Sequence, residues 1–140
     1  MFLLHTLTIA LHVLFAAAWF GMAAAVPSLA RAVRAGTVEG GKVIGAMNGS
    51  AVLFYLFAVA NWTLGMRLGF EAQYNHWAYH TSITLGLVLV GVQFLLIRPG
   101  WNRLVGGGDE GRLRAGLGIG NLVWVAIFVL MYVGRGVIGA

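Results

Sequence analysis

The sequence predicts an all-α membrane protein, a single domain of four antiparallel transmembrane helices over residues 1–140. Hydrophobic residues make up 60% of the chain and charged residues 9%, whereas about a quarter of the residues of a soluble domain are charged. Four apolar stretches cover roughly residues 2–30, 43–66, 78–97 and 115–134. Each is long enough for a helix to cross a bilayer. The spans and their turns occupy the whole chain, so we expect no second domain and a lipid bilayer as the surrounding partner.

The basic residues predict the orientation of these helices. Arg67 and Arg135 lie at one end of the predicted bundle. The other seven of the nine lysines and arginines lie in the first and third turns, namely Arg31, Arg34, Lys42, Arg98, Arg103, Arg112 and Arg114. Cytoplasmic loops are enriched in Lys and Arg. The net charge of +5 therefore indicates topology and not nucleic-acid binding. We expect a multi-pass protein of a bacterial-type inner membrane, with both termini outside.

The first two spans carry signals of close packing. The first ends near Pro27 and is followed by a basic turn. The second opens with a ridge of small residues at a spacing of four, formed by Gly41, Gly45 and Gly49. Small residues let helix backbones approach closely in a membrane. We expect this ridge to pack against the alanine-rich second half of the first span.

The last two spans are separated by the longest predicted loop. This segment, residues 99–111, begins with Pro99 and contains a run of three glycines, 106–108, so the sequence predicts a flexible cytoplasmic turn. The fourth span repeats the small-residue device with Gly116 and Gly120.

Two of the four histidines are predicted at the same depth. Alternate helices of an antiparallel bundle run in the same direction, so the first and third spans can be compared directly. At about 1.5 Å per residue, His12 lies about 28 Å before Arg31 and His80 about 27 Å before Arg98. Imidazoles are common axial ligands of haem iron. We therefore predict His12 and His80 as the two axial ligands of one haem b near the outer face.

Other interpretations of the histidines stay open. His5 and His76 lie at or beyond the outer boundary, where histidines usually bond water, headgroups or backbone. A site of His12, His76 and His80 would suit copper or zinc. His12 and His80 could also form hydrogen bonds to other helices without any cofactor.

Supporting groups are predicted at the same level on the other two helices. Asn61 could orient a ligating imidazole, and Met131 offers a thioether ligand. Arg67 and Arg135 lie one to two turns further out and could pair with haem propionates.

Aromatic residues form a predicted layer towards mid-membrane, which would suit either core packing or the wall of a flat macrocycle. The layer contains Phe15, Trp19, Phe20, Phe54, Tyr55, Phe57 and Trp124. Interfacial belt positions are predicted for Trp62, Trp77, Tyr79 and Trp101.

The first span resembles that of a superfamily of small membrane proteins. Residues 11–21 read LHVLFAAAWFG, with Pro27 following. This pattern is similar to the copper-resistance D type and to the four-helix, haem-associated protoporphyrinogen oxidase of bacteria. The length and the four spans resemble the oxidase family over the whole chain, which implies haem ligation by His12 and His80. The chain departs from that family in its single lysine, Lys42, which lies in a loop.

These patterns define the functions that we weigh. The apolar spans contain no acidic residue, which excludes paired carboxylates and Ser-His-Asp arrangements within the bundle. The predicted activity is electron transfer or redox chemistry, as a possible membrane oxidoreductase acting on a quinol- or porphyrinogen-like substrate. The alternatives are an outward-facing copper or zinc protein and a cofactor-free accessory subunit of a larger membrane complex. A homo-oligomer is compatible with each of them.

Overall fold

The computed structural model describes residues 1–136 of the chain and contains helices joined by short turns. The elements in order are α1 (Phe2–Arg34), α2 (Gly40–Arg67), α3 (Glu71–Tyr74), α4 (Trp77–Val92), the π-helix η1 (Gln93–Ile97), α5 (Arg98–Val105) and α6 (Gly111–Gly136). Four spans are long and apolar enough to cross a membrane: Phe2–Arg34, Gly40–Arg67, Trp77–Val105 and Gly111–Val133. The predicted all-α four-helix membrane protein is confirmed.

The third span is longer than predicted, and the predicted loop after Pro99 is wrong over its first half. α4, η1 and α5 follow one another without a break, so residues 99–105 are helical. Proline has no N–H to donate to the carbonyl four residues earlier, which here is that of Leu95. The side chain of Arg112 donates instead, with Nη2 2.7 Å from the Leu95 oxygen. The helix can therefore continue through the proline.

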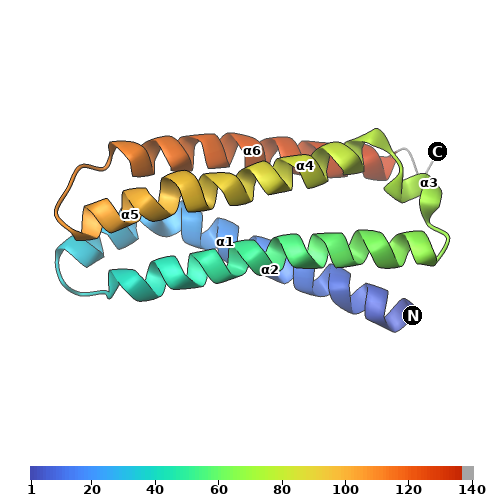
Figure 1. Ribbon diagram of the computed structural model, residues 1–140, viewed down its shortest axis with the longest axis horizontal. Helices are drawn as coiled ribbons and strands as arrows, with labels where there is room; N and C mark the ends of the chain where they lie inside the picture. Colours follow the sequence, from blue (N-terminus) through green and yellow to red (C-terminus); the bar gives the residue numbers. More distant parts are fainter. Residues whose placement is uncertain (137–140) are drawn as a thin grey trace.

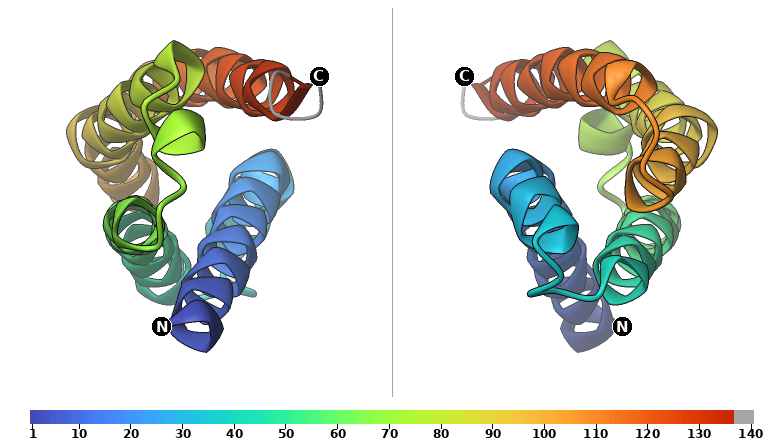
Figure 2. Two further views of the ribbon diagram at one scale, coloured as in Figure 1. Left: turned by 90° about the vertical axis from the view of Figure 1, so that its right-hand side faces the viewer. Right: turned by 90° about the vertical axis from the view of Figure 1, so that its left-hand side faces the viewer.

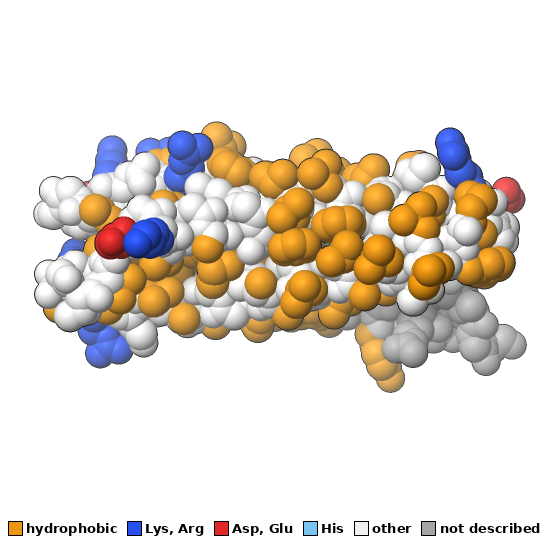
Figure 3. Space-filling model, turned by 90° about the horizontal axis from the view of Figure 1, so that it is seen from below, with side chains coloured by type: hydrophobic (Ala, Val, Ile, Leu, Met, Phe, Trp, Pro, Cys, Tyr) orange, Lys and Arg blue, Asp and Glu red, His pale blue; other side chains and the backbone are white. Residues whose placement is uncertain are grey.

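The helices form a four-membered bundle in which the N-terminus and the end of α6 lie on one side (Figure 1). α1 packs mainly along α2, and α4 along α6, while α2 and α4 join the two pairs. α1 is inclined to the others and diverges from α6 towards its N-terminus (Figures 1 and 2). Charged side chains gather at the two ends, and apolar side chains cover the middle of the surface (Figure 3). This distribution suits a helical bundle surrounded by lipid.

Two apolar clusters hold the bundle together. One lies near the turns that carry most of the basic residues and includes Met47, Trp101 and Leu104. Trp101 is fully buried and donates from Nε1 to the carbonyl oxygen of Gly40 at 2.8 Å. The predicted belt position of Trp101 is therefore wrong, because α5 continues the third span and packs against α2. The second cluster includes Trp19 and Trp124 and lies at mid-bundle.

On α2, the glycines that were predicted to pack closely do not do so. Gly41, Gly45 and Gly49 are exposed, and an added Cβ would meet nothing within 4 Å. The predicted ridge is therefore wrong. On α6 the prediction holds at Gly116, where a Cβ would come within 2.9 Å of Ile97. A Cβ at Gly120 would lie 3.7 Å from Leu89, which is an ordinary contact distance, so close packing of α6 against η1 requires a glycine at position 116 but not at position 120.

Candidate functional site

A cavity of about 530 Å³ occupies the half of the bundle nearest the chain termini. This volume lies within the range of about 300–1,000 Å³ that is usual for ligand sites. Its walls come from α1, α2, α3, α4 and α6, and most of the lining is apolar or aromatic. The lining residues are Ile9, His12, Val13, Ala16, Ala17, Phe20, Phe54, Ala58, Asn61, Trp62, Gln73, Tyr74, Tyr79, Ile83, Trp124, Ile127, Phe128 and Met131.

His12 is the only described histidine in this wall. Its Nδ1 lies 3.0 Å from the carbonyl oxygen of Phe54 on α2, and its ring stacks on the Phe54 ring with centroids 4.6 Å apart. A carbonyl can only accept a hydrogen bond, so Nδ1 carries the proton and Nε2 keeps its lone pair. No described residue bonds to Nε2. Metal-ligating histidines are commonly held in this way by a backbone carbonyl.

A polar network closes the outer end of the cavity. The Tyr74 hydroxyl on α3 lies 2.9 Å from Nε2 of His5 and donates to Oδ1 of Asn61 at 3.2 Å. Burial raises the pKa of Tyr74 above its usual value, and Tyr79 acts in the same direction, while the bond to Asn61 opposes both. The short helix α3 is thereby tied to α1 and α2 across the cavity mouth.

A second bond strengthens this cover. Gln73 donates from Nε2 to the Tyr79 hydroxyl at 3.0 Å, which joins α3 to α4. Tyr79 lines the cavity and is only partly exposed, so its position differs from a simple belt residue. The cavity is consequently polar at its outer end and aromatic at its inner end, where Phe20 and Trp124 meet with ring centroids 5.8 Å apart.

The structure does not bring His80 to this site. His80 is exposed and lies against Trp62 with ring centroids 6.4 Å apart, whereas its neighbour Tyr79 faces the cavity. Successive helical residues are rotated by about 100°. The buried face of α4 contains Ala78, Ser82 and Leu89, so His80 turns away although its depth matches that of His12.

The three-histidine metal site is not assembled either. His76 precedes α4 as its N-cap, where Nδ1 accepts a hydrogen bond from the Ala78 amide at 3.3 Å. His12, His76 and His80 therefore have three different surroundings. Within residues 1–136, no three His, Cys, Asp or Glu side chains form a group that could hold a metal ion.

The structure places two of the predicted supporting residues in the cavity wall and a third outside it. Asn61 and Met131 both line the cavity, as their predicted depth suggested. Arg67, at the end of α2, is exposed and does not line it. Arg135 falls in the last turn of α6, and its side chain lies outside the described residues.

The cavity faces the lipid between α1 and α6. These two helices make little backbone contact, and Phe20 bridges them by packing against Trp124 and Phe128. Val13 and Phe128 line the cavity, yet they are 57% and 51% exposed. On this side, therefore, the cavity is lined by apolar side chains that are also exposed at the surface of the bundle.

Sequence reasoning missed α3 and its network. Gln73 and Tyr74 lie in a turn of ordinary composition. In the structure the Tyr74 ring fills the space beside Gly65, so α3 packs tightly against α2. The available signal was a glycine in the last turns of an apolar helix, followed by a tyrosine within one short turn.

No family model, curated protein or solved structure matches this chain. The resemblance of the first span to the four-helix oxidase and copper-resistance D families therefore rests on the sequence pattern alone and stays a prediction.

Proposed function

We propose that the protein binds one b-type haem in the cavity, with His12 as the nitrogen ligand of the iron. The observation that carries the proposal is the bond from His12 Nδ1 to the Phe54 carbonyl, which leaves Nε2 free at the wall of a large apolar cavity. The site fits a flat macrocycle in its chemistry, because aromatic rings form its inner end and hydrogen-bonding groups its outer end. His80 has no place in this arrangement.

Met131 would be the second residue to hold the haem iron, through its thioether sulfur. It comes from α6 and lines the same cavity as His12, and a His/Met pair raises the reduction potential relative to two histidines. Asn61 and Tyr74 would bond to polar substituents of the macrocycle at the outer end. Bound haem would supply one-electron exchange, and the surrounding residues would hold it in an apolar environment that excludes water.

A quinol- or porphyrinogen-like molecule is the redox partner that the site favours. Such molecules dissolve in the bilayer, and the lipid-facing side between α1 and α6 gives access from there. We propose further that the membrane is a bacterial-type inner membrane and that the cavity lies in its outer half, because the basic turns lie at the opposite end of the bundle.

An absorption spectrum of the purified protein tests the proposal. We expect a Soret band that shifts on reduction and that is lost in the His12→Ala variant. His80→Ala is the matched control, because it removes an imidazole at the same depth outside the cavity, and it should retain the band. Met131→Leu should retain haem but change its reduction potential.

Three outcomes would contradict the proposal. A Soret band that survives in a folded His12→Ala variant would exclude His12 as the ligand. Bound copper or zinc without a Soret band would favour the metal-protein alternative. Neither haem nor metal in protein purified from haem-replete cells would favour the cofactor-free accessory subunit.

A further inference from the structure

Three arginines at the basic end of the bundle, Arg31, Arg98 and Arg112, have no acidic partner among the described residues, and two of them, Arg98 and Arg112, contact neighbouring residues of η1. Arg34 and Arg114 contact Glu110, Arg103 contacts Asp109, and Lys42 contacts Glu39. Arg98 and Arg112 are exposed, and neither has a carboxylate within 4.0 Å among the described residues. Their positive charge is therefore not compensated within the described protein.

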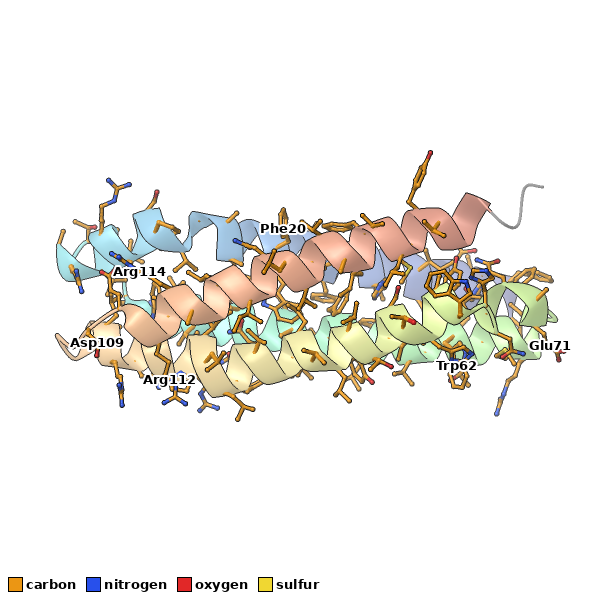
Figure 4. All side chains as sticks on the ribbon, turned by 90° about the horizontal axis from the view of Figure 1, so that it is seen from above. Phe20, Trp62, Glu71, Asp109, Arg112 and Arg114 are labelled. Atoms are coloured by element: carbon orange, nitrogen blue, oxygen red, sulfur yellow. The ribbon has the colours of Figure 1, made fainter. Side chains whose placement is uncertain are left out.

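Both guanidinium groups are held beside the same stretch of η1. Arg112 donates to the Leu95 carbonyl at 2.7 Å, and the Arg98 guanidinium lies over the adjacent Phe94 ring, 6.0 Å from its centroid. Figure 4 shows Arg112 at the start of α6, at the end of the bundle opposite Trp62. Because these contacts already orient the side chains, binding an anion there costs less conformational entropy than binding by free arginines would.

The surroundings of the pair are those of a membrane interface. Leu95 is 67% exposed and lies on the apolar side of the two arginines. Arg98 follows the apolar part of the third span, and Arg112 precedes that of the fourth. An acyl chain beside Leu95 would place a phosphate at the level of both guanidinium groups.

We propose that Arg98 and Arg112 form a binding site for the headgroup of an anionic glycerophospholipid. Arginine offers several N–H donors in a planar group that suits phosphate oxygens. Arg112 uses only one of its nitrogens, Nη2, for the hydrogen bond to the Leu95 carbonyl. A phosphate with a net negative charge balances the pair better than a zwitterionic headgroup, whose own cation competes. We name the pair the arginine lipid site.

The test compares lipid binding by variants of the intact protein in neutral detergent. Dioleoyl phosphatidylglycerol is titrated and the bound lipid is counted by native mass spectrometry. A basic residue near an anionic surface contributes about 1 kcal/mol, or about fivefold in affinity. Arg98→Gln should therefore weaken binding about fivefold, and the double variant Arg98→Gln/Arg112→Gln about 25-fold.

The matched control is Arg103→Gln/Arg114→Gln, which removes the same charge from the same end of the bundle at residues that have acidic partners. We expect less than a twofold effect. An equal loss in both double variants would mean diffuse attraction and would overturn the proposal.

Two further arms identify the ligand and control for folding. Phosphatidylcholine should bind at least tenfold more weakly than phosphatidylglycerol. Inorganic phosphate should not displace the lipid, and displacement at equal concentration would mean a soluble anion as the ligand. Arg98→Gln keeps the bond from Arg112 to Leu95, so unchanged binding by this variant contradicts the site even if the double variant unfolds.

Discussion

Gln93 is fully buried at the start of η1 and connects three helices through its amide. Its Oε1 accepts a hydrogen bond from Trp19 Nε1 on α1, and its Nε2 donates to Asn48 Oδ1 on α2, both at 3.0 Å. A buried amide with both ends bonded fixes the rotation of its helix, because any other rotation leaves polar groups unpaired. The Gln93 network therefore sets the register among α1, α2 and the third span.

Replacing Gln93 by leucine should destabilise the protein by about 1–2 kcal/mol. Interhelical side-chain bonds in membranes average about 0.6 kcal/mol and reach about 1.7 kcal/mol, and this change removes two of them. The free energy of unfolding can be measured by titration with a denaturing detergent. Thr63→Val is the control, because Thr63 bonds only to Val59 within its own helix. An equal loss of stability in both variants would mean that the interhelical hydrogen bonds of Gln93 do not stabilise the fold as predicted.

Tyr74 should make the stability of the protein fall at alkaline pH. Burial raises its pKa in the folded state, so its contribution is fully present below the unfolded pKa of about 10 and is lost as the pH rises through the higher folded value. Tyr74→Phe should remove this component of the alkaline loss and, by deleting the bonds to His5 and Asn61, lower the stability at neutral pH by about 1 kcal/mol.

Unfolding measured from neutral to alkaline pH checks the Tyr74 prediction, together with the ultraviolet titration of tyrosinate. Tyr132→Phe is the control, since Tyr132 is 81% exposed. If Tyr74→Phe and the unmodified protein lose stability in parallel above a pH of about 10, the buried Tyr74 phenol is not responsible for the alkaline loss of stability.

Residue depth could be predicted from the sequence, but rotation could not. His12, Asn61 and Met131 were predicted at one level, and all three line the cavity. His80 has the matching depth and faces outwards. The direction that a residue faces depends on which side of α4 packs against α6, and an apolar span without a polar face gives no signal for that choice.

At the scale of elements, the four spans follow directly from hydropathy, and the errors lie at their ends. Pro99 suggested a helix end because it removes a backbone donor. The replacement donor comes from Arg112, which is distant in sequence. Gly41, Gly45 and Gly49 suggested a packing face, but the tight contacts on α2 are at Gly40, beside Val105, and at Gly65, beside Tyr74. Such contacts depend on tertiary partners that local patterns do not identify.

Gly100 should be the least replaceable glycine of the contact between α5 and α6. An added Cβ would lie 2.5 Å from the backbone nitrogen of Leu113 and 2.7 Å from its Cα. Backbone cannot move aside as a flexible side chain can, so Gly100→Ala should destabilise the protein by about 1–3 kcal/mol. Gly45→Ala should be neutral or stabilising by up to about 1 kcal/mol, since its Cβ enters open space on a helix. Detergent unfolding of both variants tests this difference, and equal stabilities would contradict it.

At the scale of the whole molecule, the cavity results from the way that two helix pairs meet. α1 with α2 and α4 with α6 each pack closely, while α1 diverges from α6 towards the termini (Figure 1). The space between them is covered at one end by α3 and bounded at mid-bundle by Phe20 and Trp124. The divergence of one helix, and with it the cavity, cannot be predicted from span lengths and hydropathy.

The orientation in the membrane can be tested on a chain that contains no cysteine. Single cysteines at Asn75, beside α3, and at Thr37, in the turn after α1, would report the two ends of the bundle. Seven of the nine basic residues lie at the Thr37 end, and positively charged loops stay in the cytoplasm. In intact cells, a membrane-impermeant thiol reagent should therefore label Asn75→Cys and not Thr37→Cys. Both should react after permeabilisation, which controls for accessibility. Labelling of Thr37→Cys alone in intact cells would invert the topology and place the cavity in the cytoplasmic half of the membrane.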